Sequence, residues 1–284
     1  MNLLSTGSLA KAYGEKKLFD KVAFGIDDSD KIGLIGINGT GKTSFLKVIA
    51  GIDEADAGSF IKSSNLKIEY LAQNPDFDFE ITVLEQVFEG SSPLMVLLRE
   101  YENVSSSLEK NPTDTKLQMR LMELNAKMDL NEAWQIEREA KTVLMKLGIM
   151  EFDKKIGELS GGQRKRVAMA GALIRPCDLL ILDEPTNHID NETITYLEDY
   201  LSNRKGALLM VTHDRYFLDR VVNKIWELDE GKLYAYQGAY TKFLELKAQR
   251  EADDKRIQEK KQSLYKNELA WMRKGVEARR TKQK

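Results

Sequence analysis

The sequence has few of the features that define secreted or membrane proteins. Cys177 is the one cysteine in 284 residues, which excludes a disulfide framework and fits a reducing compartment. No apolar run approaches the roughly 20 residues that span a bilayer. The start, MNLLSTGSLAKAYGEKK, lacks the apolar core and cleavage pattern of a signal peptide. We therefore expect a cytoplasmic protein without a membrane domain.

Charge is nearly balanced in total but unevenly distributed. Lys and Arg number 43 against 45 Asp and Glu, for a net charge of −2. Residues 247–284 carry 13 basic and 6 acidic side chains, a net charge of +7, whereas residues 1–246 carry 30 and 39. This asymmetry predicts nucleic acid or another acidic surface as a partner of the basic end. A solvated helix with surplus lysine is the alternative interpretation.

The pattern along the chain predicts an α/β fold. With 42% hydrophobic residues, the length suffices for one large α/β domain or two smaller ones. Apolar runs punctuated by Gly, Asp and Ser predict strands, and apolar residues at helical spacing predict helices. Strands are predicted within 1–35, at 68–73, 178–184 and 207–213, and in a hairpin over 224–238 that turns at Asp229–Lys232. Helices are predicted from Gly41 to Gly51, over 82–148 with a break at Asn111–Pro112, and from Tyr240 to about Lys274.

The stretch GINGTGKT, Gly36–Thr43, is the strongest local signal of chemistry. It fits G-x-x-x-x-G-K-[ST] between a predicted strand and a predicted helix. In this pattern, glycines turn backbone N–H groups toward phosphate oxygens, Lys42 reaches the β and γ phosphates, and the Thr43 hydroxyl can ligate Mg²⁺. The stretch therefore predicts nucleotide binding. The predicted binding residues here are Gly36, Asn38, Gly39, Thr40, Gly41, Lys42, Thr43 and Ser44.

Two carboxylates end the apolar run LLILDEP, Leu179–Pro185. At the strand tip, Asp183 can hold Mg²⁺ through water. The next residue, Glu184, points elsewhere and can polarise an attacking water. An acidic loop at a strand end is the alternative interpretation, which the P-loop in the same chain disfavours.

The motif LSGGQ, Leu159–Gln163, precedes the amphipathic pattern RKRVAMAGALIR. Ser160 is of the N-cap type, and Gly161 and Gly162 expose backbone N–H groups. This is the pattern of a second phosphate-binding helix start. Alone, the motif could be an ordinary helix cap. In the same chain as a P-loop and LLILDEP, it is a specific signal of a phosphate-binding helix start.

Together these motifs resemble the ATP-binding cassette ATPases over about residues 1–240. The resemblance implies a P-loop NTPase fold of the α/β class, with a mixed core sheet, an antiparallel β subdomain and a helical subdomain. It also implies ATP hydrolysis with Mg²⁺. The expected division is a cassette over 1–240, with a helical subdomain and arm at about 84–158, followed by the start of a helical interdomain linker over 241–284.

Further site residues follow from the resemblance, position by position. Tyr13 matches the aromatic that stacks on adenine, a plain strand aromatic being the alternative. Gln73 matches the glutamine that senses Mg²⁺ and the attacking water, and His213 the switch histidine at the γ-phosphate. Asp190 matches a loop that contacts the opposite site, and His188 is interpreted as structural. The implied catalytic set is Lys42, Gln73, Glu184 and His213, and the implied metal set is Thr43, Gln73 and Asp183.

The geometry of the family implies that the chain is one of two cassettes that work as a pair. In this family, the signature residues close over ATP that a facing domain holds. With one P-loop and one LSGGQ, the chain needs a second cassette, either the C-terminal half of a longer chain or a copy of itself. We expect the isolated half to hydrolyse ATP weakly. The implied signature contacts are Ser160, Gly161, Gly162 and Gln163.

Other stretches resemble the ABC-F branch, and the linker resembles its Uup type. They are EPTNHID at 184–190, DRYFLDRV at 214–221, YQGAYTKFLELK at 236–247 and GVEARRTK near the end. The resemblance implies a ribosome-associated translation factor that contacts rRNA and tRNA, with an ATP-driven clamp that positions the linker near the peptidyl-transferase centre. Two alternatives stay open: the ATP-binding subunit of a membrane transporter, and a DNA-associated ATPase.

The linker is predicted to be a projecting helix with an apolar stripe. Residues 240–274 as one helix would extend roughly 50 Å. Ile257, Leu264 and Trp271, with Met272 beside them, recur at seven-residue spacing, which suits an antiparallel helix partner. The partner would lie beyond the last residue, so we expect the chain to be the N-terminal part of a longer protein.

The tip of the linker is predicted to turn and to contact RNA. Gly275 can break the helix. The basic side chains around it form a footprint suited to RNA phosphates, while a solvated charged helix is the alternative. The predicted RNA contacts are Arg273, Lys274, Arg279 and Arg280.

Overall fold

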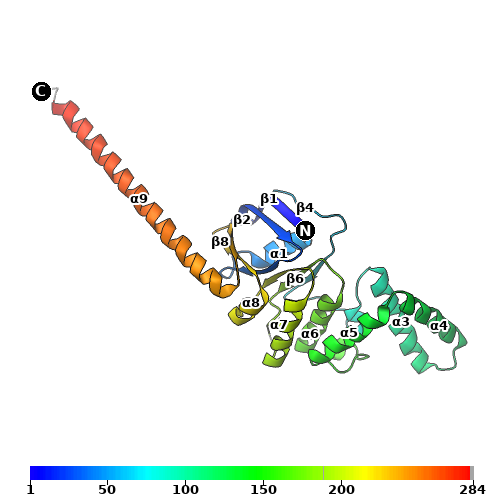
Figure 1. Ribbon diagram of the computed structural model, residues 1–284. Helices are drawn as coiled ribbons and strands as arrows, with labels where there is room; N and C mark the ends of the chain where they lie inside the picture. Colours follow the sequence, from blue (N-terminus) through cyan, green and yellow to red (C-terminus); the bar gives the residue numbers. More distant parts are fainter. Residues whose placement is uncertain (188, 282–284) are drawn as a thin grey trace.

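The computed structural model describes residues 1–187 and 189–281, which form two β-sheets surrounded by helices (Figure 1). The smaller sheet is antiparallel, with strand order β2-β1-β4. The larger sheet has strand order β5-β6-β7-β3-β8-β9; β9 is antiparallel to β8, and the other neighbours are parallel. The strands are β1 Asn2–Tyr13, β2 Lys16–Asp27, β3 Lys31–Ile35, β4 Ile61–Lys62, β5 Ile68–Leu71, β6 Leu179–Asp183, β7 Ala207–Val211, β8 Lys224–Asp229 and β9 Lys232–Gln237.

The helices fall into four groups along the chain. The first follows the P-loop, the second forms a helical region that lies to one side of the sheets, the third covers one face of the larger sheet, and the last projects away from the body as a single rod (Figure 1). The helices are α1 Lys42–Ala50, α2 Val83–Val87, α3 Pro93–Lys110, α4 Thr115–Leu130, α5 Ala133–Lys146, the 3₁₀ turn Ile156–Glu158, α6 Gly161–Ile174, α7 Asn191–Asn203, α8 Arg215–Val221 and α9 Tyr240–Thr281.

Apolar side chains fill both faces of the larger sheet. On one face, the strands pack against α1 and the antiparallel sheet; on the other, they pack against α6, α7 and α8. An aromatic group anchors the first face, with the ring centroid of Phe24 lying 4.9 Å from that of Trp226 and 5.2 Å from that of Phe45. Because β6 and β7 are buried along their whole length, they have the continuous apolar pattern typical of parallel strands.

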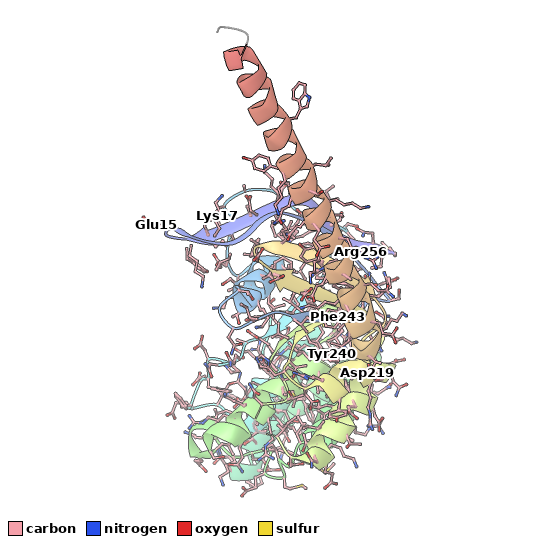
Figure 2. All side chains as sticks on the ribbon, turned by 90° about the vertical axis from the view of Figure 1, so that its left-hand side faces the viewer. Glu15, Lys17, Asp219, Tyr240, Phe243 and Arg256 are labelled. Carbon is pink, nitrogen blue, oxygen red and sulfur yellow. The ribbon has the colours of Figure 1, made fainter. Side chains whose placement is uncertain are left out.

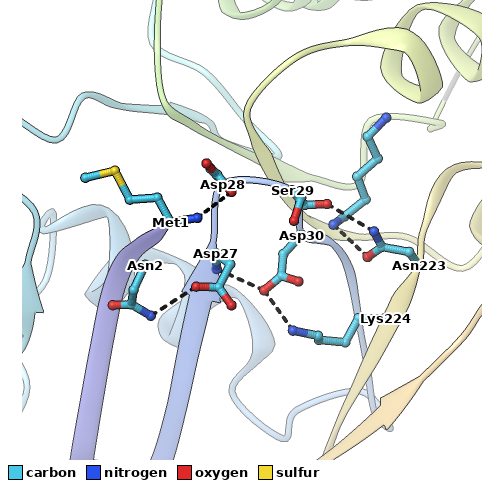
Figure 3. Close-up of polar contacts among 9 residues, drawn as sticks. Met1, Asn2, Asp27, Asp28, Ser29, Asp30, Asn223 and Lys224 are labelled. Atoms are coloured by element: carbon cyan, nitrogen blue, oxygen red, sulfur yellow. Dashed lines mark hydrogen bonds and ion pairs between the residues drawn. The ribbon is translucent and has the colours of Figure 1, made fainter.

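A polar corner joins the two sheets where β2 turns into β3 (Figure 3). The side chain of Asp30 is 11% exposed; its Oδ2 accepts hydrogen bonds from the backbone N–H of Asp27, at 2.9 Å, and from Lys224 Nζ, at 2.7 Å. Asn223 accepts from the backbone N–H of Lys31 and donates to Ser29. These contacts fix the start of β3, which leads directly into the P-loop.

The predicted α/β class is confirmed, with its mixed core sheet, antiparallel sheet and helical region. The hairpin over 224–238 is also confirmed. The division into a cassette and a linker at residue 240 stays a prediction, although α9 begins at Tyr240.

The predicted break at Gly275 is wrong, because α9 continues through this residue to Thr281. A glycine inside a helix costs only about 1 kcal/mol relative to alanine. The residues on both sides, such as Arg273, Lys274, Glu277 and Ala278, are strong helix formers that offset this cost.

A poorly compensated carboxylate is buried in the helical region. The Glu102 side chain on α3 is 14% exposed, and its Oε1 accepts no hydrogen bond from the described residues. Lys141 Nζ lies 3.9 Å from this oxygen but donates its hydrogen bond to Glu137. Burial raises the pKa of Glu102 to about 7, against the opposing charge of Lys141.

Replacing Glu102 by Gln is therefore expected to stabilise the protein at pH 8 and to change little at pH 5. Since the folded-state pKa of about 7 lies above the ordinary value of 4.5, the carboxyl weakens the fold increasingly as pH rises between these values. Urea denaturation should show a gain on the order of 1–3 kcal/mol in the free energy of unfolding at pH 8. Glu259→Gln, at an exposed position on α9 away from Glu102, is the control. Equal gains at both pH values would contradict the prediction.

Candidate nucleotide site

The P-loop joins β3 to α1 in a backbone conformation that requires glycine. Gly41, the N-cap of α1, has a φ of 98°, and a Cβ there would lie 2.9 Å from Leu18 Cβ. At Gly36, a Cβ would lie 2.5 Å from the carbonyl oxygen of Leu228 on β8. Side chains at these two positions would push the loop away from its neighbours. The glycines thus let the loop lie directly on β8 and β2.

A cavity of about 490 Å³ opens beside the P-loop. It brings together residues from six parts of the chain: the end of β1, the start of β2, the P-loop, the segment after β5, the end of β6 with the loop that follows it, and the end of β7. Its volume falls within the range typical of small-molecule sites. The residues that line it are Tyr13, Leu18, Asn38, Gly39, Gly41, Lys42, Thr43, Ser44, Gln73, Asp183, Glu184, Asn187, Val211 and His213.

Lys42 lies against the P-loop itself. Its Nζ donates hydrogen bonds to the carbonyl oxygens of Gly36, at 2.8 Å, and Ile37, at 3.2 Å. Burial lowers the pKa of this ammonium, while the charges of Glu184 and Asp183 act in the opposite direction. A partly buried cation among backbone carbonyls, beside the N-terminus of a helix, suits the binding of a phosphate chain.

Asp183 and Glu184 end β6 at the floor of the cavity. Asp183 is 2% exposed, and the Glu184 side chain is 7% exposed. Each has a buried carboxylate oxygen without a hydrogen-bond partner among the described residues. Burial raises the pKa of both carboxyls. Such oxygens are costly to bury unless a ligand pairs with them, so they favour a site for a cation or for water.

Glu184 is held in a strained conformation that turns it toward His213. Its φ of 55° is unusual for a residue with a side chain. Its backbone N–H donates to the carbonyl oxygen of Val211 at 2.8 Å, and His213 Nε2 lies 3.3 Å from its Oε1. Strain of this kind is found preferentially at functional sites. The two side chains form a pair across the ends of β6 and β7.

The residues present fit Mg²⁺. Thr43 and Asp183 both line the cavity, and Asp183 Oδ2 is buried without a hydrogen-bond partner among the described residues. Among these residues, no group of three or more His, Cys, Asp or Glu side chains is arranged to hold a metal. Mg²⁺ in phosphate-transfer sites is typically held by one or two side chains, water and the phosphates themselves. Thr43, Asp183 and Gln73 would hold the ion here.

The signature motif does not line this cavity, although Gly162 lines a smaller adjoining pocket together with Gln73 and Glu184. Ser160 caps α6 in a capping box: its hydroxyl accepts from the backbone N–H of Gln163, and Gln163 Oε1 accepts from the backbone N–H of Ser160. A Cβ at Gly161 or Gly162 would meet nothing within 4 Å among the described residues. The structure therefore does not bring the signature residues to the P-loop of this chain, as the resemblance implies.

Two further predicted residues have structural contacts. Asp190 caps α7, its Oδ1 accepting from the backbone N–H of Thr193 at 2.9 Å. These hydrogen bonds lower the pKa of Asp190. Thr40 donates to the carbonyl oxygen of Ile37 at 2.9 Å within the P-loop. His188 and the side chains of Arg273, Lys274, Arg279 and Arg280 lie outside the described residues.

The sequence interpretation missed two polar residues at the site. Asn187, in EPTNHID, lines the cavity, and Lys16, the first residue of β2, donates from Nζ to the carbonyl oxygen of Gly39 at 2.9 Å. Asn187 lies within a motif that the sequence did single out. The P-loop contact of Lys16 depends on the approach of two distant segments, which no local pattern indicates.

The base of α9 is fixed to the cassette beside the P-loop. Figure 2 shows Asp219, Tyr240 and Phe243 gathered there, with Arg256 further along the helix. The backbone N–H of Thr241 donates to Asp219 Oδ1, on α8, at 2.7 Å. The buried Phe243 packs edge-to-face on Tyr236 of β9, with ring centroids 5.1 Å apart.

Glu227 on β8 is the centre of this attachment. It is 4% exposed; its Oε1 accepts from Lys247 Nζ at 2.5 Å, and its Oε2 lies 3.1 Å from Arg250 Nη1. The Arg250 guanidinium stacks on the ring of Tyr234 at 3.8 Å from its centroid. Because Glu227 pairs with Ile35 in the sheet, the attachment lies one residue before the P-loop.

Beyond its base, α9 has an exposed apolar stripe at the predicted positions. Ile257, Leu264 and Trp271 are 50%, 63% and 78% exposed, so none of them packs on the cassette. A helix partner for this stripe stays a prediction. Met272 lies outside the residues whose side chains are described.

A family model described as ABC transporter matches residues 19–187, and a second with the same description matches residues 226–284. The first covers more than half of the chain and includes the P-loop, the signature motif and both carboxylates. The chain therefore belongs to the ATP-binding cassette family. A cassette of this family binds ATP, which agrees with the cavity beside the P-loop.

Relatives place the chain more narrowly. It is 52% identical, over its full length, to the uncharacterized ABC transporter ATP-binding protein YfmR of Bacillus subtilis, of which it covers 45%. It is 38% identical, over 96% of its length, to the energy-dependent translational throttle protein EttA of Mycobacterium tuberculosis, covering 49% of it. It is 34% identical, over 99% of its length, to the ATP-binding protein Uup of Haemophilus influenzae, covering 43% of it. Like EttA and Uup, it is an ABC-F protein.

A solved structure supports the fold. The archaeal ribosome recycling factor aABCE1, in complex with the ribosomal stalk protein aP1, aligns with a TM-score of 0.60 and 25% identity, over 88% of this chain and 42% of that one. The coverages of YfmR, EttA and Uup given above show that the chain spans about half the length of the curated relatives it matches. Within the described residues, no helix is long and apolar enough to cross a membrane.

Replacing Glu227 by Gln is expected to loosen the first turns of α9. The change removes the charge that compensates Lys247 and Arg250, at a cost of about 2 kcal/mol, because both cations are partly exposed. Hydrogen exchange of the amides of residues 240–250 should become faster. Glu245→Gln, which alters only an exposed ion pair with Lys242, is the matched control. Unchanged exchange in the Glu227 variant would refute the role of this attachment.

Proposed function

We propose that the chain is the N-terminal, ATP-hydrolysing cassette of an ABC-F translation factor that acts on the ribosome. The observation that carries the hydrolytic part is the Glu184–His213 pair, which faces Lys42 across one cavity. A general base, a cation for phosphate oxygens and a polar switch residue are what phosphoryl transfer to water requires. The names of EttA and aABCE1, which refer to translation and ribosome recycling, support the ribosome as the site of action.

In this proposal, the P-loop amides and Lys42 bind the β and γ phosphates of ATP, and Tyr13 stacks on the adenine. The raised pKa of Glu184 suits a general base that accepts a proton from the attacking water near neutral pH. His213 holds Glu184 in place and contacts the γ-phosphate. When bound, Mg²⁺ would offset phosphate charge. Gln73 lies in the same cavity, where it can orient the attacking water.

A second cassette is part of the proposal. Ser160, Gly161 and Gly162 are exposed at the start of α6, where their hydrogen-bonding groups can reach a nucleotide held by a facing P-loop. Asp190, at the start of α7, would contact the opposite site. The half-length match to YfmR, EttA and Uup supports a second half in the full protein. Two bound ATP molecules would then hold the two cassettes together as a closed clamp, and their hydrolysis would let the cassettes separate.

The basic linker is proposed to meet RNA. Arg273, Lys274, Arg279 and Arg280 lie on the last turns of α9, far from the cassette (Figure 1). Arginine and lysine side chains bind RNA phosphates in a salt-dependent manner. Closing the clamp would position this part of the helix on rRNA or tRNA. A DNA target and a transporter subunit are the competing functions.

Replacing Glu184 by Gln in the full-length protein is expected to keep ATP binding and to lower kcat at least about 100-fold, since the general base is lost. Steady-state phosphate release and equilibrium ATP binding measure the two effects. Glu192→Gln, at an exposed position on α7, is the matched control. Normal turnover in the Glu184 variant would exclude its role as the base.

The same Glu184→Gln protein is expected to sediment with ribosomes in the presence of ATP and to be released without it, because the closed clamp cannot reopen. Nuclease treatment separates binding to ribosomes from binding to free RNA or DNA. A transporter subunit would instead purify with a membrane-embedded partner. If ATP causes no association with ribosomes, the proposed translation role is wrong, whatever the ATPase rate.

A further inference from the structure

The turn that carries Tyr13 is fixed by a polar group that the ATPase mechanism does not use. Tyr13 ends β1 and is 53% exposed at the edge of the nucleotide cavity. Its hydroxyl donates to Asp53 Oδ2 at 2.5 Å. Asp53 Oδ1 in turn accepts from Lys11 Nζ at 2.8 Å, and Lys11 also donates to the carbonyl oxygen of Glu54. One carboxylate therefore bridges a tyrosine and a lysine from the same strand.

Lys11 is placed to support the ring as well as the carboxylate. It is 8% exposed, and its Nζ lies over the Tyr13 ring, 5.3 Å from the centroid. A cation at this distance from an aromatic face is attracted to it. Since the cation covers one face, the opposite face is the one available to a flat ligand. The Asp53 carboxylate meanwhile holds the hydroxyl end of the side chain, which restrains its rotation about the Cα–Cβ bond.

The loop that carries Asp53 is attached to the P-loop helix. The backbone N–H of Asp53 donates to the carbonyl oxygen of Lys47, in the last turn of α1, at 3.2 Å. Further along, the loop pairs with β1, where the backbone N–H of Ala10 donates to Ala57 and that of Ala12 donates to Asp56. The loop between α1 and β4 therefore ties the Tyr13 platform to the helix whose N-terminus faces the phosphates.

We propose that Asp53 and Lys11 are positioning residues, which hold the Tyr13 ring at a fixed distance from the P-loop so that it accepts the purine base of ATP. The inference rests on the stacking role proposed for Tyr13. A ring held in place before binding loses less conformational entropy when the base arrives, and this increases affinity without a new contact. Neither residue lines the nucleotide cavity, so we expect the catalytic step to be independent of them.

Binding of ATP and of inorganic tripolyphosphate, which has no base, separates this role from a merely structural one. Asp53→Asn and Lys11→Met are expected to weaken ATP binding about three- to tenfold and to leave tripolyphosphate binding unchanged. In the full-length protein, KM for ATP should rise by the same factor at constant kcat. Tyr13→Phe, which keeps the ring and removes its hydroxyl, should match Asp53→Asn, and the double variant should be no weaker than either.

Glu54→Gln is the matched control, since it changes the neighbouring, exposed carboxylate on the same loop. Thermal unfolding of each variant shows whether the loop remains folded. If Tyr13→Ala weakens ATP binding but Asp53→Asn and Lys11→Met do not, the positioning role is wrong and the stacking role stands. If Tyr13→Ala also binds ATP normally, the stacking role proposed above fails with it. Equal weakening toward ATP and tripolyphosphate would show a general structural effect and overturn the inference.

Discussion

The site depends on the alignment of three parallel strands at their carboxyl ends. Val211 on β7 pairs with Leu34 on one side and with Asp183 on the other, so β3, β7 and β6 end level with one another. The P-loop, the two carboxylates and His213 each begin within one or two residues of these ends. In open α/β sheets, ligands bind where such strands end. One shared register thus brings together groups that are about 30 to 170 residues apart along the chain.

The buried polar atoms at this edge have a cost that the rest of the fold must offset. Asp183 and Glu184 each keep an unpaired, buried oxygen, and Glu184 has an unfavourable φ. Buried carboxylates of this kind would be selected against in an ordinary core. The continuous apolar packing of β6 and β7 on both faces of the sheet supplies the stabilisation that tolerates them. A divalent cation or a water molecule that donates a hydrogen bond would satisfy the same atoms.

Much of the fold and of the candidate site could be predicted, for a specific physical reason. The P-loop, LLILDEP and LSGGQ are each continuous, and each combines a structural signal with a chemical one, so the sequence alone indicates residues such as Lys42 and Asp183. It does not indicate the contacts of Lys16, Asp53 and Lys11, because these join segments that only tertiary packing brings together. Gly275 is the opposite case. Its low helix propensity alone predicts a break, but the helix propensity of its neighbours outweighs that of one glycine, and α9 continues through it.

The attachment of α9 has a mechanical consequence. The helix has 42 residues, and the described side chains that hold it to the cassette lie in its first turns. At 1.5 Å per residue, its length is about 60 Å, so a tilt of about 5° at the base moves the far end by about 5 Å. Glu227 and Asp219 thus hold α9 at the end about which it would tilt, and Glu227 lies beside the strand that leads into the P-loop. A shift there that is too small to repack the core would move the distal end by more than the roughly 3.4 Å between stacked bases of a duplex.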